Sequence, residues 1–190
     1  MRLVTAFALF VLVGLLAGCA TLSKSQCQTG DWRAIGQADG MNGYSLARLD
    51  EHREACSKHG VTVDAALYTA GRDLGLRSYC TTQNASKVGL AGRSYQNVCE
   101  GEMGLSFVRI YRAASDVKYV NDQITSLQSQ IKEKTEELAK PALTQQQRDS
   151  LVKQIADLNS DVTSQLTRRS EKEAILRQVM LEEQNRLNAL

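Results

Sequence analysis

Apolar positions divide the 190-residue chain into three stretches with different patterns. The first is a continuous apolar run from Leu3 to Leu16, which one positive charge, Arg2, precedes. The second extends to about residue 105 and mixes short apolar groups with all five cysteines and all but one of the glycines of the chain. The third, which runs from there to residue 190, repeats its apolar positions at steps of three and four. Each pattern predicts a different kind of structure.

The N-terminal run is typical of a secretory signal peptide. Its length of about 14 residues is shorter than the roughly 20 that a helix needs to span a bilayer. The end of the run, Leu16-Ala17-Gly18-Cys19, resembles the bacterial lipobox, in which the cysteine sulfur receives a diacylglyceryl group before the signal peptide is removed. We therefore predict a lipoprotein signal peptide at residues 1–18 and lipid attachment at Cys19. The alternative is an ordinary cleaved signal peptide.

A lipid-carrying Cys19 predicts where the mature protein resides. Two or more acyl chains, palmitate among them, anchor a protein durably, whereas one chain binds only marginally. The next residue is Ala20 and not aspartate, which resembles the signal for transfer to the outer membrane. We expect a protein of the cell envelope, attached to the outer membrane and facing the periplasm, with residues 19–26 as a lipidated linker.

The third stretch predicts a helical hairpin over residues 106–190. Reading back from Leu138, apolar residues continue at heptad spacing, and the pattern extends to Phe107, so the first helix is expected to begin near Ser106. Pro141 ends it, because proline lacks the amide donor that a helix interior needs. Two long helices joined by a turn at 140–144 will lie antiparallel as a coiled coil. The first apolar stripe consists of Val117, Val120, Ile124, Leu127, Ile131 and Leu138.

The second helix of the hairpin is predicted to begin at Gln145. Thr144 and Gln147 have the spacing of a capping box, in which each side chain accepts a hydrogen bond from the other's backbone amide. We expect the two stripes either to bury only each other or, in addition, to present a surface to a partner. The second stripe consists of Leu151, Ile155, Leu158, Val162 and Leu166, then Ile175 or Leu176, Val179 and Leu187.

The middle stretch, residues 27–105, is predicted to be a small helical module tied by disulfides. Export to an oxidising compartment makes two disulfides the expectation for Cys27, Cys56, Cys80 and Cys99. Four cysteines allow three connectivities. We favour Cys27 with Cys56 and Cys80 with Cys99, since the second pair would close a polar, glycine-containing loop from Thr81 to Asn97. Short helices are expected over residues 31–41, 46–58 and 63–74.

The order of cysteines, glycines and aromatic residues in this module resembles a known family, the bacterial lipoproteins catalogued as domain of unknown function 2799. The resemblance covers residues 27–112. It implies an envelope lipoprotein module and brings no established activity. The residues that carry it are Trp32, Ile35-Gly36, Asp39-Gly40, Gly43, Cys56, Tyr68, Gly71, Gly75-Leu76, Tyr79-Cys80, Gly89, Gly92, Tyr95 and Val98-Cys99.

Few side chains in the sequence offer catalytic or metal-binding chemistry. His52 and Cys56 are four residues apart on an expected helix and would form a thiolate–imidazole pair if Cys56 were reduced. In a disulfide, Cys56 has no thiolate, and we then expect His52 to be an exposed helix residue and His59 a favourable charge at a helix end. We predict no metal, no cofactor and no catalytic residue.

Two hypotheses of function follow. The first is a membrane-anchored, non-enzymatic envelope protein with a structural or protein-interaction role, whose hairpin binds a protein partner or a second copy. The net charge of +2 lacks the basic bias of nucleic-acid binding. The alternative is a peptidoglycan-binding or glycan-cleaving module with its site around Asp39 and Tyr95, where two carboxylates would act as acid and base. The candidate carboxylates are Asp39, Asp50, Glu54, Asp64 and Asp73, and Trp32, Tyr68, Tyr79 and Tyr95 are expected in the core.

Overall fold

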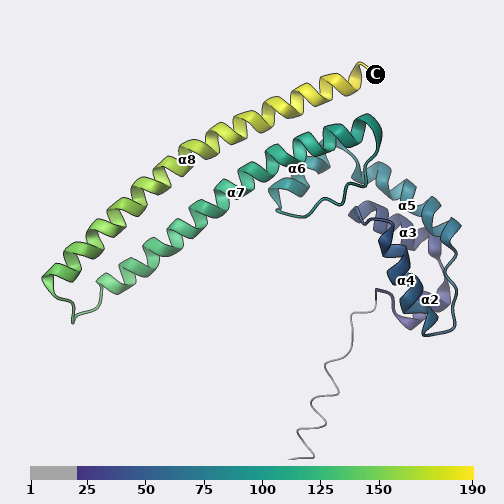
Figure 1. Cartoon of the computed structure of the whole chain (residues 1–190), viewed down its shortest axis with the longest axis horizontal. Coiled ribbons are helices and arrows are strands. Elements are labelled where there is room, and N and C mark those ends of the chain that lie inside the picture. The colour runs from purple at the N-terminus through teal and green to yellow at the C-terminus, as the bar shows by residue number, and fades with distance from the viewer. Residues whose placement is uncertain (1–20) are drawn as a thin grey trace, which may run out of the picture. The chain divides into compact units, whose positions relative to one another are not determined.

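The computed structural model describes residues 21–190 (Figure 1). The predicted signal peptide, residues 1–18, and Cys19 lie outside the described residues. Over the range that is described, the chain forms seven α-helices and no strand, which confirms the mainly α fold class. None of these helices is both long enough and apolar enough to cross a membrane.

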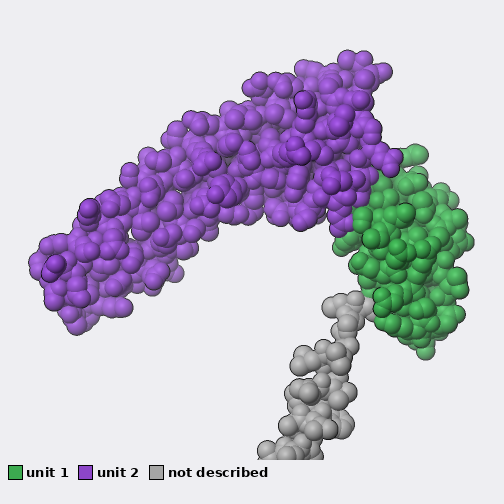
Figure 2. Space-filling view, in the orientation of Figure 1, with its two compact units in different colours: residues 1–79 green, residues 80–190 purple. Residues whose placement is uncertain are grey.

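The chain divides into two compact units (Figure 2). Unit 1 ends at Tyr79 and unit 2 comprises residues 80–190. The sequence analysis placed the boundary between head and hairpin after residue 105. The contacts place it earlier because residues 80–105 pack on the hairpin, so the second disulfide belongs to the same unit as the long helices.

The described part of unit 1, residues 21–79, contains four helices. The three expected in this region are present with ends shifted by a few residues, and one short helix occupies part of the predicted linker. That helix, α2, begins because Ser23 and Gln26 form a capping box. Asp31 caps α3 by accepting a hydrogen bond from Ala34. The bounds are α2 Lys24–Thr29, α3 Trp32–Asn42, α4 Ala47–Ser57 and α5 Ala65–Tyr79.

The core of unit 1 surrounds a disulfide between Cys27 and Cys56, whose Cα atoms are 5.4 Å apart. Both cysteines are completely buried. The bond ties α2 to α4 across a loop of 29 residues. In the chain-entropy model, a loop of this length stabilises the fold by roughly 3 kcal/mol. The apolar residues packed around it are Leu22, Trp32, Leu49, Val63 and Tyr68.

Glycines allow α3 and α5 to cross in backbone contact. A Cβ atom on Gly36 would lie 2.0 Å from the carbonyl oxygen of Tyr68, and one on Gly71 would lie 2.0 Å from the carbonyl oxygen of Arg33. Gly40 and Gly75, one turn further along each helix, are equally close to the opposite backbone. No other residue fits at these four positions, since real Cβ atoms do not approach backbone so closely. The crossing therefore fixes the separation of α3 and α5.

Unit 2 begins with a helix that the sequence analysis did not expect. Residues 82–90 were predicted to be part of a loop, but they form α6 (Thr82–Leu90), which Thr81 caps through the amide of Asn84. Its Gly89 lies against Ala114 of the next helix, α7 (Gly101–Leu138), where an added Cβ would be 2.6 Å from the alanine methyl. Of the polar residues that indicated a loop, Gln83 and Lys87 are exposed on α6, whereas Thr82 and Ser86 are buried. A disulfide between Cys80 and Cys99 brackets this segment, with Cα atoms 5.5 Å apart.

Helices α7 (Gly101–Leu138) and α8 (Gln145–Asn188) form the predicted antiparallel hairpin. Helix α8 begins at the predicted residue, with the capping box of Thr144 and Gln147 in place. Helix α7 begins five residues before Ser106, because residues 101–105 continue the helix towards the second disulfide. Figure 1 shows the two helices running side by side from α6 to the turn.

The apolar stripes of the hairpin meet as expected; on α8 the structure decides one open alternative and corrects one position. Leu176 is buried and Ile175 is 47% exposed, so Leu176 is the residue of the stripe. Leu166 is 40% exposed, although it was predicted in the stripe. The exposure of Ile175 and Leu166 has one cause: two helices bury only a narrow seam, and residues at its edges remain open to solvent.

Candidate functional site

Unit 1 contains a chain of four hydrogen-bonded side chains centred on Asp39, buried except at its partly exposed Thr21 end. The Oδ2 atom of Asp39 accepts hydrogen bonds from His52 Nε2 at 2.7 Å and from the Tyr68 hydroxyl at 2.8 Å. On the other side of the imidazole ring, Nδ1 of His52 lies 2.7 Å from the hydroxyl of Thr21. His52 and Tyr68 are almost completely buried, and Asp39 is 8% exposed.

Three helices place these side chains. Asp39 lies on α3 just before Gly40, at the point where the glycines bring α3 against α5. The same crossing brings Tyr68 of α5 to the carboxylate. His52 comes from α4, one turn before Cys56, whose disulfide fixes that helix to the core. The ring planes of His52 and Tyr68 meet edge to face, with centroids 5.7 Å apart.

The donors and acceptors of this network determine one another. An ionised carboxylate only accepts hydrogen bonds, so Nε2 of His52 donates to Asp39. In the neutral ring Nδ1 is then an acceptor, and the Thr21 hydroxyl donates to it. Burial, followed by the hydrogen bond to Asp39, raises the pKa of Tyr68 well above its ordinary range, so the phenol stays protonated and continues to donate.

A hydroxyl, an imidazole and a carboxylate in a row are also the components of a nucleophilic triad. Here the order on the ring is reversed relative to the serine-protease arrangement, in which the hydroxyl contacts Nε2 and the carboxylate contacts Nδ1. Each side chain of the network instead forms a hydrogen bond that another side chain of the network needs. The arrangement holds Thr21, and with it the start of the described chain, on the core.

His52 corrects one expectation from the sequence. It was predicted to be exposed, but it is 1% exposed and hydrogen-bonded at both ring nitrogens. The helical spacing placed it on the face of Cys56, and that face points inward. No thiolate–imidazole pair forms, because Cys56 is bonded to Cys27. His59 is exposed just after the end of α4.

The other candidate carboxylates are at the surface. Asp50 pairs with Arg53 and Glu54 with Lys58 on their own helix. Asp64 accepts the amide of Leu67 and caps α5, and Asp73 is exposed. Of the five, only Asp39 is buried. Among residues 21–190, no group of three histidine, cysteine or acidic side chains is arranged to hold a metal ion.

The aromatic residues occupy the positions expected of core residues, and one contributes to unit 2. Trp32, Tyr68 and Tyr79 are buried in unit 1. Tyr95 stacks on Phe107 of α7, with centroids 4.4 Å apart, and its hydroxyl accepts the amide of Cys99. Asp39 and Tyr95, which the glycan hypothesis combined, belong to different compact units.

A second buried carboxylate, Glu183, lies in the hairpin and was not singled out from the sequence. It is 1% exposed and accepts hydrogen bonds from Ser106 and Arg109 of α7, each at 2.7 Å, and from Arg186. Burial alone would raise the pKa of Glu183, but the hydrogen bonds from Arg109, Ser106 and Arg186 outweigh it and lower that pKa to about 2. The sequence could have indicated it, because Glu183 is an acidic residue at a position that continues the apolar stripe of α8 between Val179 and Leu187.

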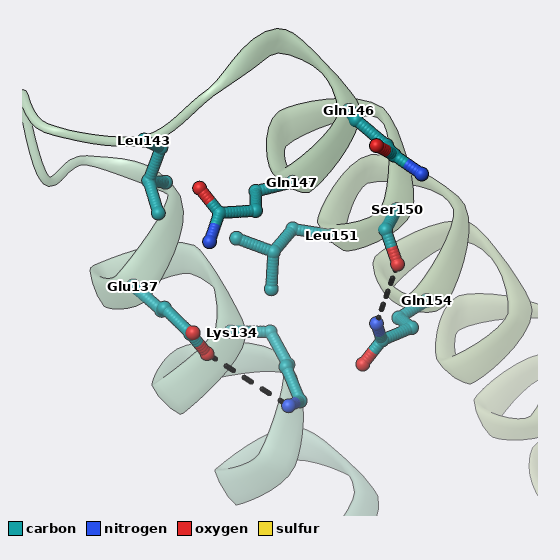
Figure 3. A pocket seen from close by; sticks show the side chains of 8 residues that line it. All are labelled: Lys134, Glu137, Leu143, Gln146, Gln147, Ser150, Leu151 and Gln154. Atoms are coloured by element: carbon teal, nitrogen blue, oxygen red, sulfur yellow. Dashed lines mark hydrogen bonds and ion pairs between the residues drawn. The ribbon is translucent and has the colours of Figure 1, made fainter.

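The surface hollows of unit 2 lie along the hairpin. One, of about 560 Å³, is lined by Leu105, Val108, Arg109, Arg112 and Arg186. Another, of about 340 Å³, lies at the tip (Figure 3). There Leu151 and Leu143 point inward among polar side chains, and Ser150 bonds Gln154 at 3.1 Å. Its remaining lining residues are Lys134, Glu137, Gln146 and Gln147.

Part of the chain matches the model of a known protein family. Residues 31–116 match the family model described as "Protein of unknown function (DUF2799)". This part of the chain is similar to the DUF2799 family. This confirms the resemblance found in the sequence. No curated protein matches the chain, and no solved structure does.

The DUF2799 match coincides with the structural features described above. It begins at Asp31, the N-cap of α3, and ends in the part of α7 that packs on α6. It includes Asp39, His52 and Tyr68 of the buried network, whereas Thr21 precedes it. Most glycines of the resemblance are therefore explained by close helix contacts, and the other two, Gly43 and Gly92, have a positive φ. Most of the hairpin lies outside it.

Proposed function

We propose that this chain is a membrane-anchored envelope lipoprotein with a non-enzymatic role, in which the hairpin of α7 and α8 binds another protein. The observation that carries the proposal is the half-buried seam of the distal hairpin. The last fully buried residue of α7 is Ile124, and Leu151 is the only buried residue in the first half of α8. Between them lie apolar residues that two helices cover only in part: Leu127, Ile131, Ile155, Leu158, Val162 and Leu166.

An additional helix along this seam would complete its burial. Each fully buried leucine, isoleucine or valine contributes about 1.5–3 kcal/mol relative to its exposed state. An amphipathic helix laid into an apolar groove is a common mode of protein recognition. Val152 and Leu166 are 55% and 40% exposed, and they lie two heptads apart on one edge of α8. A partner helix from another envelope protein or from a second copy would cover this edge.

The buried network supports a non-enzymatic role for unit 1. Asp39 is the one interior carboxylate among the five candidates, and its Oδ2 atom is already shared by His52 and Tyr68. A glycan-cleaving mechanism needs two carboxylates on either side of a bond. The other four candidates lie at the surface, where two of them pair with lysine or arginine on their own helix.

Photo-crosslinking in intact cells tests the docking surface. A photoreactive amino acid at Val152 or Leu166 is expected to give a discrete adduct, either with another envelope protein or with a second copy of the chain. Asp157 is the matched control, since it is exposed and turned by about 140° from Val152 on the same helix. Equal adduct patterns at all three positions, or none at Val152 and Leu166, would contradict docking at this edge.

Lipid attachment has its own test. Cells supplied with a clickable palmitate analogue should label the wild-type chain, and Cys19→Ser should abolish the label and release the protein from the membrane fraction. Ala20→Ser serves as the control, because it leaves the cysteine in place. If Cys19→Ser still carries label, the anchor lies elsewhere.

A further inference from the structure

The chain is bound to the core of unit 1 from Thr21 onwards. The Thr21 hydroxyl bonds His52 in the buried network. The next residue, Leu22, is 5% exposed and packs in the cluster that contains Trp32. Ser23 then caps α2, and Cys27 of that helix is joined to Cys56. Residues 19–26 were predicted to be a linker, but four successive constraints make the part from Thr21 a piece of the folded unit.

Only Ala20 therefore separates the proposed lipid-bearing residue from the first fixed side chain. Two extended residues reach at most about 7 Å. A fully flexible linker from residue 19 to residue 26 would have a root-mean-square reach of roughly 15 Å and would let the unit move freely above the bilayer. Because the connection is short, unit 1 cannot move that far from the bilayer unless the contacts of Thr21 and Leu22 break.

We infer that unit 1 lies directly against the headgroup surface of the membrane, held there by the connection from Cys19 to Thr21. The inference rests on the proposed lipidation of Cys19. Thr21 and His52 act as positioning residues, because they fix the point at which the chain leaves the unit. The partner of this face is a phospholipid bilayer surface, and the side of unit 1 that carries Thr21 faces it.

Trp32 provides the measurement, since it is the only tryptophan of the chain and packs in the same cluster as Leu22. Purified mature lipidated protein, with both units intact, is placed in phosphatidylcholine vesicles that contain a dansyl-labelled headgroup lipid. Energy transfer from Trp32 to dansyl then reports the distance of unit 1 from the bilayer surface. The comparison variant carries ten glycine and serine residues inserted between Ala20 and Thr21, which adds a root-mean-square reach of roughly 17 Å.

The insertion is expected to lower the transfer efficiency at least twofold while both proteins float with the vesicles. The matched control carries the same ten residues in the turn between α7 and α8 and should keep the wild-type efficiency. Equal transfer in wild type and in the Ala20–Thr21 insertion variant would overturn the inference, because the short connection would then not set the distance.

A second variant tests the positioning residues. Thr21→Val combined with Leu22→Ala removes the first two contacts and leaves the disulfide to Cys56 intact. Its transfer efficiency should fall towards that of the insertion variant, with circular dichroism unchanged, and wild-type efficiency would speak against a role for these contacts. If mass spectrometry finds no acyl chain on the wild-type protein and the protein does not float with the vesicles, the proposed lipidation is refuted. That outcome differs from the equal transfer efficiencies that would overturn the inferred contact between unit 1 and the membrane.

Discussion

At the scale of single residues, unit 1 depends on polar and small side chains whose roles are set by their neighbours. Asp39 receives two hydrogen bonds in the interior, and Gly36 and Gly71 let backbones touch. A buried group that loses its partner costs more than the hydrogen bond itself contributes. Substitutions at these positions should therefore act mainly through stability.

Asp39→Asn separates a structural role from a catalytic one. The amide has one acceptor oxygen and no charge, so we expect a loss of roughly 2 kcal/mol in the free energy of unfolding. Asp73→Asn, at an exposed position of α5, should change it by less than about 0.5 kcal/mol. Urea unfolding with the disulfides intact measures both. A cellular defect in Asp39→Asn with unchanged stability and amount of folded protein would favour the glycan-cleaving alternative.

Gly71→Ala should destabilise unit 1 although alanine is the better helix former. The added methyl would lie 2.0 Å from the carbonyl oxygen of Arg33, and overpacking of this kind costs about 3 kcal/mol or more. Ala38→Gly, at an exposed position of α3, is the control and should cost only about 1 kcal/mol. The two variants are compared by urea unfolding. A smaller effect for Gly71→Ala would mean that α3 and α5 separate easily.

Glu183 should make the stability of unit 2 depend on acid. Its pKa is about 2 in the folded hairpin and near 4.5 when the chain is unfolded, so the folded state favours the ionised form. Its contribution is fully present above about pH 4.5 and is lost as the pH falls towards 2. Glu183→Gln should lower stability by roughly 2 kcal/mol at neutral pH.

The difference between wild type and Glu183→Gln should then shrink in thermal melts from pH 4.5 to pH 2. Glu171→Gln, which changes an exposed residue of α8, should melt like wild type throughout. A constant difference between wild type and Glu183→Gln over this range would show that the carboxylate charge is not what its hydrogen bonds stabilise.

At the scale of the helices, the hairpin has a fixed register. Glu102 of α7 pairs with Arg186 of α8, and Asp116 pairs with Lys172. The second pair therefore lies two heptads from the first on both helices, so neither helix slips relative to the other between them. At the turn, Arg148 donates to the carbonyl oxygens of Leu138 and Lys140 and holds the two helix ends together. Removal of equal lengths from both arms should therefore preserve every remaining pair.

A shortened hairpin tests this register. Deletion of residues 121–134 and 154–167 removes two heptads from each arm, about 21 Å of each helix, and keeps the turn and the Glu183 contacts. We expect a folded protein with unchanged helicity per residue by circular dichroism. The control lacks residues 121–134 only, which misaligns the arms and should lower helicity and melting temperature. Equal behaviour of the two deletions would contradict a fixed register.

At the scale of the whole molecule, the described chain combines two units with different means of stabilisation. Unit 1 is held by a disulfide, close glycine contacts and a buried polar network. Unit 2 is a hairpin whose well-buried part lies beside α6, and its distal part is supported by a narrow seam. In the shortened hairpin this distal seam is removed, so the partner adducts expected on α8 should be lost while the protein remains folded.

The order of residues was enough to predict the helices of the hairpin, its turn and the cap at Thr144. It favoured the pairing of cysteines that the structure contains, but it left the other two connectivities open. These features depend on local spacing and on chain chemistry, which the order of residues contains. It did not reveal α6, because the polar face of a short helix resembles a loop until its other face is seen against α7. Only the tertiary structure joined Thr21, His52, Asp39 and Tyr68, or placed Glu183 against α7. Those contacts connect residues 13 to 77 positions apart, and helix packing, not local pattern, decides which distant polar groups meet.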